Sequence, residues 1–145
     1  MHFEDGFHLV VKRDCPTCSL IEPEIRKLVE SGDFGQNLRI YIQDDPSYLS
    51  DLSQSVSDAS LESSYRLKIE TVPTLIRFEK GQETSRSVGW VRKEWSQILK
   101  DSMFGEHLPE SRPGCGSLTV MPGAKETLDA RFGDLPLNSR TIEIG

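Results

Sequence analysis

The stretch RDCPTCSLIEPEI, residues 13–25, places two cysteines, Cys15 and Cys18, three positions apart at the start of an apolar-periodic run. Residues 7–12 (FHLVVK), just before it, form a short apolar and β-branched run that is typical of a buried strand. After the cysteines, apolar residues recur at helical spacing over roughly four turns. The sequence therefore predicts a strand that leads directly into a helix, with both thiols at the junction.

Hydrophobic periodicity divides the following residues into further strands and helices. A strand is predicted at 38–42, a helix with a break in its Ser-rich middle at 48–67, strands at 72–78 and 84–90, and a helix at 91–99. Together with the first strand and helix, the order is β-α-β-α-β-β-α. This order predicts an α/β fold in which helices cover the faces of a mixed sheet.

The composition changes from about residue 102, where Pro, Gly and Ser become frequent. The elements predicted beyond it are a strand at 117–121, a helix at 124–132 and a strand at 140–144. These elements are too small to form a core of their own. We therefore divide the chain into a domain at 1–101 and a C-terminal extension at 102–145. The extension is expected to pack on the domain, to pair with a partner, or to belong to a longer native chain.

Charge and composition argue against several classes of protein. The chain has 23 acidic and 17 basic residues, whereas a protein that follows a nucleic-acid backbone needs a basic surface. No uncharged apolar run approaches the ~18 residues of a transmembrane helix, and the first residues lack the apolar core of a signal peptide. We therefore expect a cytoplasmic protein with reduced thiols and with no nucleic-acid or membrane partner.

The position of the C-x-x-C motif gives its two thiols different expected roles. Cys15 falls at the helix N-terminus, where unpaired amides and the helix dipole favour a thiolate. Pro16 occupies the first helical position, where its missing N–H costs nothing. Cys18 lies about one turn further on and is more shielded. We expect an exposed Cys15 of low pKa to attack a disulfide and Cys18 to resolve the mixed disulfide.

Two other interpretations of the cysteine pair remain open. In the first interpretation, the pair is half of a zinc site, and the remaining ligands would be Cys115 and one of His2, His8 or His107. Zinc ribbons usually supply a second C-x-x-C or an H-x-x-x-H motif, and this sequence has neither. In the second interpretation the two thiols are inert neighbours. We expect no metal and no organic cofactor.

Further motifs follow the cysteine pair in a fixed order. They are Pro23 within the helix, DDP at 44–46 after a strand, TVPTL at 71–75, KG at 80–81 and VG at 88–89. With CPTC at 15–18, this order makes residues 7–100 resemble the thioredoxin family, within the thioredoxin/glutaredoxin superfamily. The C-terminal extension is not typical of that family.

The resemblance implies a thioredoxin-like mixed sheet and a thiol–disulfide oxidoreductase activity with Cys15 as nucleophile and Cys18 as resolving thiol. It also implies that Pro73 is cis and faces the disulfide, and that the backbone of Val72 pairs with the substrate chain. The expected substrate-docking residues are Val72, Pro73, Pro16 and Thr17. The implied partners are a protein disulfide and a reductase or oxidant.

The sequence departs from the family pattern next to the cysteines. Asp14 replaces the usual Trp, and its carboxylate opposes thiolate formation while its basic neighbours favour it. Leu9 replaces a buried aspartate that helps to move protons off the second thiol in the family. We therefore expect slower resolution at Cys18, or another proton acceptor such as Glu22. These losses motivate an alternative function, a non-catalytic docking module for a partner or a downstream domain.

Two features outside the C-x-x-C motif bear on the substrate. CPTC is closer to the glutaredoxin motif than to that of thioredoxin, but residues 88–92 (VGWVR) lack the Gly-Gly and acidic pair that caps glutathione. Glutathione binding is therefore not supported, and a protein disulfide is the expected substrate. Cys115 is either an accessory redox thiol that exchanges with the Cys15–Cys18 pair or a free cysteine in a flexible turn.

Overall fold

A five-stranded mixed sheet forms the centre of the protein, here in a computed structural model that describes residues 3–31 and 37–133. Its strands are β1 (Gly6–Val11), β2 (Leu38–Ile42), β3 (Ser55–Ser57), β5 (Thr74–Glu79) and β6 (Gln82–Val88). They lie in the order β3-β2-β1-β5-β6, in which β1, β2 and β3 are parallel while β5 runs antiparallel to both β1 and β6. The predicted α/β class with a mixed sheet is confirmed.

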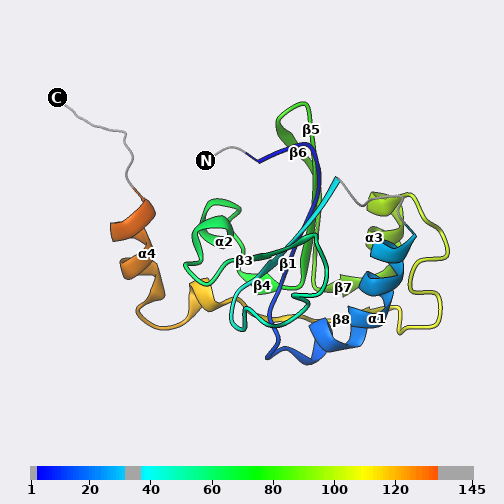
Figure 1. The fold of residues 1–145 in the computed structure, drawn as a ribbon, viewed down its shortest axis with the longest axis horizontal. Coiled ribbons are helices and arrows are strands. Elements are labelled where there is room, and N and C mark those ends of the chain that lie inside the picture. The colour runs from blue at the N-terminus through cyan, green and yellow to red at the C-terminus, as the bar shows by residue number, and fades with distance from the viewer. Residues whose placement is uncertain (1–2, 32–36, 134–145) are drawn as a thin grey trace.

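Helices lie on both faces of the sheet: α1 (Pro16–Glu30) and α3 (Arg92–Leu99) lie together on one face, and α2 (Glu62–Arg66) lies on the other (Figure 1). Helices α1 and α3 each bury an apolar stripe against the sheet. The stripe of α1 consists of Ile21, Ile25 and Leu28, all of which are buried. No helix in the described ranges is long and apolar enough to cross a membrane.

The helix predicted at 48–67 is wrong over most of its length. Residues 47–54 form turns, Ser55–Ser57 pair with β2 as the edge strand β3, and only Glu62–Arg66 are helical. The physical reason is the richness of this segment in Ser and Asp, whose side chains compete for backbone hydrogen bonds. The buried carboxylate of Asp58 accepts the backbone amides of Ser63 and Ser64 at 3.0 and 2.9 Å, and it thereby places the start of α2.

Two of the predicted strands are each divided in two. Pro73 separates β4 (Thr71–Val72) from β5, and Gly89 separates β6 from β7 (Trp90–Val91). Gly89 has a φ of +75°, a left-handed conformation that glycine adopts without steric cost. The predicted final helix is present as α3. Because β4 and β7 leave the main sheet, their edges are open to other strands.

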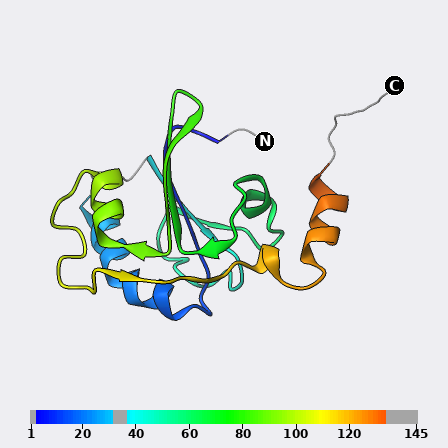
Figure 2. The same cartoon turned by 180° about the vertical axis from the view of Figure 1, so that it is seen from behind.

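The described part of the extension packs on the domain and supplies those strands. Strand β8 (Ser111–Arg112) pairs with β7, and strand β9 (Cys115–Gly116) pairs with β4. Figure 2 shows this segment, in yellow, running past the ends of the central strands on its way to α4. The described part of the extension therefore packs on the domain, which is one of the three arrangements expected for it.

Beyond β9, one of the predicted elements is wrong and one is confirmed. Residues 117–121 do not form a strand; Leu118–Val120 form a 3₁₀ turn, η2, which begins where the Ser117 side chain accepts the amide of Thr119 at 3.1 Å. The predicted helix is present as α4 (Ala124–Phe132), and the strand predicted at 140–144 lies outside the described residues.

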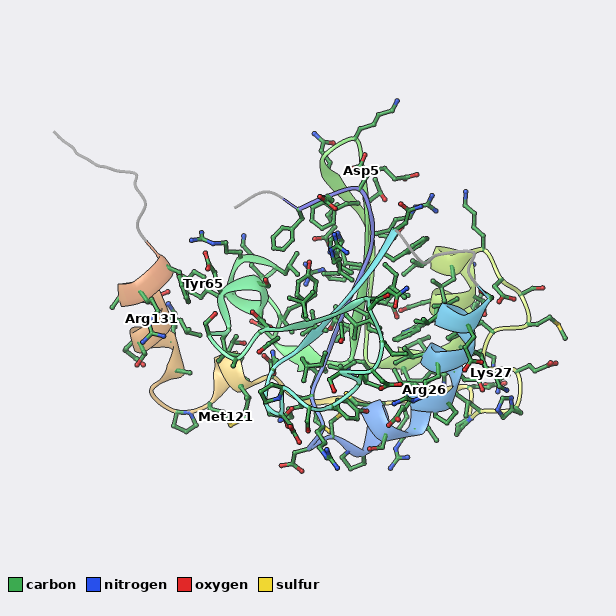
Figure 3. All side chains as sticks on the ribbon, in the orientation of Figure 1. Asp5, Arg26, Lys27, Tyr65, Met121 and Arg131 are labelled. Atoms are coloured by element: carbon green, nitrogen blue, oxygen red, sulfur yellow. The ribbon has the colours of Figure 1, made fainter. Side chains whose placement is uncertain are left out.

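Helix α4 lies against α2. Tyr65 of α2 points toward α4, which carries Arg131 (Figure 3). The Tyr65 hydroxyl donates a hydrogen bond of 2.6 Å to the carboxylate of Asp129, and the rings of Tyr65 and Phe132 lie 6.0 Å apart. The extension is therefore held at β7, at β4 and at α2.

Candidate thiol site

Cys15 lies where β1 meets α1, as the sequence predicts. It is the N-cap residue of α1, and its Sγ atom accepts a hydrogen bond from the backbone amide of Cys18 at 3.3 Å. Pro16 occupies the first turn of the helix, so it removes a donor that would have no partner there. The thiol of Cys15 thus takes the place that a capping oxygen usually has at a helix N-terminus.

Strand β4 faces this thiol. The Cys15 Sγ atom lies 3.7 Å from the carbonyl oxygen of Val72, and the Val72–Pro73 peptide bond is cis, as the resemblance implies. The carbonyl of Pro73 accepts the amide of Gly89 at 2.8 Å. The two cysteines at the β1–α1 junction therefore lie beside the cis-proline between β4 and β5. The sheet that carries both elements has the strand order β3-β2-β1-β5-β6.

The fold is thioredoxin-like. We call the backbone of Thr71 and Val72 the docking edge, because the resemblance implies that a substrate chain pairs there. Thr17, the other docking residue predicted on α1, is buried, and its hydroxyl donates a hydrogen bond of 2.6 Å to the carbonyl of Pro113. The structure thus brings Cys15, Thr17 and Val72 together, and it adds a segment of the extension to them.

The expectation that Cys15 is exposed is wrong. Its exposed fraction is 2%, and Cys18 is completely buried. The reason is the extension, since β9 pairs with the docking edge beside the thiol and Pro113 accepts the Thr17 hydroxyl. Cys18 is the more shielded of the two, as predicted, although the difference is small.

Cys115 lies in β9, directly opposite Val72 in the antiparallel register. Its thiol is close enough to Cys15 to lower the pKa of that thiol, and all three cysteines are free thiols. Cys115 is thus a free cysteine, as the second interpretation has it, but it lies in a strand and not in a turn. Positions 15 and 115 are 100 residues apart, and no motif in the sequence connects them.

Hydrogen bonds assign the negative charge to Cys15. The Cys18 thiol, followed by the Cys115 thiol and the backbone amides of Cys18 and Thr17, lowers the pKa of Cys15 to about 5, although burial opposes this shift. The same bond to Cys15, together with burial, raises the pKa of Cys18 well above its ordinary value. Burial and the bond to Cys15 also raise the pKa of Cys115. These shifts favour the thiolate at Cys15 over a thiolate at Cys18 or Cys115.

We expect the thiolate absorbance of Cys15 to persist down to about pH 5 and to disappear below it. An ordinary thiol with a pKa of about 8.5 would lose its thiolate signal already below pH 8. The measurement is the ultraviolet difference spectrum between the protein and its Cys15→Ser variant across a pH series. Because the Cys115 thiol lowers the pKa of Cys15, Cys115→Ala, which removes the donor, should move the midpoint to a higher pH; an unchanged midpoint would contradict this role of Cys115.

The charged residues next to Cys15 are engaged with the segment after β2. The Arg13 guanidinium pairs with Asp45 at 3.0 Å, and the backbone amides of Arg13 and Asp14 donate to the Asp44 carboxylate at 2.8 and 3.0 Å. The groups that shift the pKa of Cys15 are the neighbouring thiols, burial and backbone amides. The conformation of the turn before Cys15 depends instead on Asp44.

The structure also shows polar anchors of the extension that sequence reasoning missed. The Lys12 ammonium donates a hydrogen bond of 2.7 Å to the carbonyl of Gly116. The buried side-chain amide of Gln43 donates to the Ser117 hydroxyl at 2.8 Å and accepts the amide of Leu118 at 3.0 Å. Lys12 and Gln43 follow β1 and β2, but a strand-end position does not reveal which distant segment a side chain will bind.

Two expectations concerned proton transfer at Cys18. Leu9 is buried in β1, so an apolar side chain fills the position at which the family has an aspartate. Glu22 accepts a hydrogen bond from Arg26 at 3.1 Å and is partly exposed, which makes it an ion-paired carboxylate on the surface of α1. Its role as proton acceptor stays a prediction.

The histidines considered as zinc ligands have other partners. His8 shares a hydrogen bond of 2.9 Å with the Tyr41 hydroxyl, and His107 lies 3.0 Å from the carboxylate of Glu24. His2 lies outside the described residues. Within the part of the chain that the structure describes, no three His, Cys, Asp or Glu side chains are arranged to hold a metal ion.

Comparison with known proteins finds matches among solved structures alone. No family model matches the chain, and no curated protein matches it either. Among solved structures, an uncharacterized conserved protein from Geobacillus kaustophilus has a TM-score of 0.50 at 14% identity, with 77% of this chain and 75% of that chain covered. Thioredoxin O2 from Arabidopsis thaliana, in an oxidized state, has a TM-score of 0.41 at 22% identity, with 71% and 73% covered. At 14% identity the likeness to the protein from Geobacillus kaustophilus concerns the fold alone.

Proposed function

We propose that the protein is a thiol–disulfide oxidoreductase that acts on a protein disulfide in the cytoplasm. The observation that carries this proposal is the environment of Cys15. Its sulfur caps a helix, accepts the amide of Cys18 and lies 3.7 Å from the carbonyl of Val72. A stabilised thiolate next to a backbone edge is the arrangement that nucleophilic attack on a docked disulfide requires.

The reaction proceeds in two exchanges. The Cys15 thiolate attacks one sulfur of the substrate disulfide, the substrate S–S bond breaks, and the second substrate sulfur leaves as a thiolate. The Cys18 thiol then loses its proton to that thiolate or to water and attacks Cys15. The Cys15–Cys18 disulfide forms and the first substrate sulfur is released, so two electrons pass from the protein to the substrate. A dithiol reductant restores the pair, and the reverse sequence oxidises a substrate dithiol.

The substrate chain would pair with the docking edge by adding a β-strand, with Val72 and Pro73 on one side and Pro16 and Thr17 on the other. This mode uses backbone hydrogen bonds, so it suits a protein substrate. No step requires a metal or an organic cofactor. Because β9 already pairs with Val72, an incoming chain has to displace it.

A second candidate is the non-catalytic docking module. The observation that favours it is the cover over the site, since Cys15 is 2% exposed and β9 occupies the docking edge. In that case the fold would present its surface to a partner, and the thiols would take no part.

A redox titration tests the proposed function. The protein would be equilibrated with mixtures of reduced and oxidised dithiothreitol, and differential alkylation with mass spectrometry would locate each disulfide. We expect a reversible two-electron Cys15–Cys18 couple with a midpoint between about −300 and −120 mV. If Cys15 never pairs with Cys18 at any ratio, the oxidoreductase proposal is wrong and the docking module replaces it.

A further inference from the structure

The extension occupies the docking edge in the way that a substrate strand would. Gly116 and Cys115 of β9 lie opposite Thr71 and Val72 of β4 in an antiparallel register. The proposed function places the backbone of a substrate chain on this same edge. The docking edge is therefore occupied by β9 of the same chain.

Hydrogen bonds fix this segment from several elements. Thr17 of α1 donates to Pro113, Lys12 after β1 donates to Gly116, and the amide of Ser117 donates to the carbonyl of Glu70 at 3.0 Å. Ser117 is completely buried. Anchors lie before, within and after β9, which indicates a specific register rather than a loose contact.

The backbone of the segment also fits closely against the docking edge. A Cβ atom at Gly114 would overlap the carbonyl oxygen of Val72 and would lie 2.6 Å from Thr71 Cγ2. A Cβ atom at Gly89 would lie 3.1 Å from the Gly114 nitrogen. Glycine at 114 therefore lets the chain approach Val72 without a side chain between them.

This register brings a third sulfur to the thiol pair. Cys115 lies opposite Val72, whose carbonyl oxygen is 3.7 Å from the Cys15 sulfur, so the pairing of β9 with β4 places the Cys115 thiol beside Cys15. Cys18 and Cys115 are therefore both neighbouring thiols of Cys15. Cys115 is also less buried than either of the other two cysteines.

We propose that residues 111–117 are a built-in substrate segment, in which Cys115 exchanges a disulfide with the Cys15–Cys18 pair. The proposal rests on the proposed function, which supplies the Cys15–Cys18 disulfide. The sulfur of Cys115 attacks that of Cys15, the Cys15–Cys18 bond breaks, and a Cys15–Cys115 bond forms. Cys18 leaves with the electron pair and takes up the proton that Cys115 lost, so no external oxidant is consumed.

The exchange would give the oxidised protein a closed form. A Cys15–Cys115 bond ties β9 covalently to the nucleophile and keeps other chains away from Val72. Attack by Cys18 on Cys15 reverses the step and frees Cys115. The oxidised protein would thus be a mixture of two forms, one with a Cys15–Cys18 disulfide and one with a Cys15–Cys115 disulfide.

The test uses the full chain with the substitution Cys18→Ser, which leaves Cys115 as the sole internal partner for Cys15. The variant is equilibrated with reduced and oxidised glutathione, alkylated and digested with trypsin, which leaves Cys15 and Cys115 in separate peptides. We expect the linked peptides to be the main oxidised species, at a ratio independent of protein concentration. Cys15 bound to glutathione with Cys115 free would overturn the proposal.

A matched control tests whether the disulfide depends on the position of the thiol in β9 or forms with any thiol of the same segment. The control combines Cys18→Ser and Cys115→Ser with Ser111→Cys, which moves the thiol to the exposed strand β8. We expect at least about 10-fold less internal disulfide in the control, because its thiol is not held against Cys15. Equal amounts in the two variants would overturn the proposal.

The same experiment distinguishes this inference from the proposed function. In Cys115→Ser, the proposed function still requires a reversible Cys15–Cys18 disulfide. If that disulfide forms but Cys15 and Cys115 do not pair in Cys18→Ser, only the built-in substrate is wrong. If the Cys15–Cys18 disulfide does not form in Cys115→Ser and the Cys15–Cys115 disulfide does not form in Cys18→Ser, both the proposed function and the built-in substrate are wrong. In the unsubstituted oxidised protein, the two disulfides are expected to coexist.

Discussion

Cys15→Ser is expected to lower the rate of disulfide exchange at least about 1,000-fold, to the rate of the reductant alone. The hydroxyl cannot form a disulfide, so the first exchange has no nucleophile. The measurement is the reduction of insulin by dithiothreitol with and without the protein. Cys18→Ser should instead stop after the first exchange and leave a mixed disulfide between Cys15 and the substrate.

The comparison between the two serine variants gives this prediction its control. Both substitutions remove one sulfur from the same buried site, so a loss of folding would affect them alike, and circular dichroism would show it. Accumulation of a mixed disulfide on Cys18 rather than on Cys15 would contradict the assigned roles. Equal turnover in Cys15→Ser and the unsubstituted protein would exclude Cys15 as the nucleophile.

Gly114→Ala is expected to open the site and to raise the alkylation rate of Cys15 at least about 10-fold. The new Cβ atom would overlap the carbonyl of Val72, and backbone atoms there cannot move aside as a flexible side chain would. Strand β9 would therefore leave the docking edge. The measurement is the rate at which iodoacetamide modifies Cys15, followed by mass spectrometry of its peptide. The turnover of insulin should rise with it.

Gly116→Ala is the matched control on the same strand. A Cβ atom at Gly116 meets only the ends of two side chains, Met121 Cε at 3.4 Å and Val120 Cγ2 at 3.8 Å, which is ordinary contact. We expect the alkylation rate of Cys15 to stay within about 2-fold of that in the unsubstituted protein. Similar rates in both variants would mean that β9 does not control access to Cys15.

Opening the site also separates the two candidate functions. If Gly114→Ala exposes Cys15 and insulin turnover rises above that of the unsubstituted protein, the extension acts as a reversible cover over an active site. If Cys15 becomes reactive toward iodoacetamide while both the variant and the unsubstituted protein give only the rate of the reductant alone, the docking module is favoured. The two readouts therefore answer different questions about the same substitution.

Local signals in the sequence determined the part of the site that is local in the chain. The apolar run before Cys15, the proline at position 16 and the helical spacing after Cys18 each act within a few residues, and together they place a thiol at a helix N-terminus. The prediction failed at 48–67 because Ser and Asp side chains bind the backbone there, and the period of apolar residues does not record such bonds.

The sequence by itself therefore determined an α/β fold with a Cys15–Cys18 pair at a strand–helix junction. Only the tertiary structure decided that this pair is covered, that β9 occupies the docking edge and that Cys115 contacts Cys15. These features depend on pairing between strands far apart in the chain, and on anchors such as Lys12 and Gln43. Hydrophobic periodicity specifies which face of a segment is buried, but not which distant segment buries it.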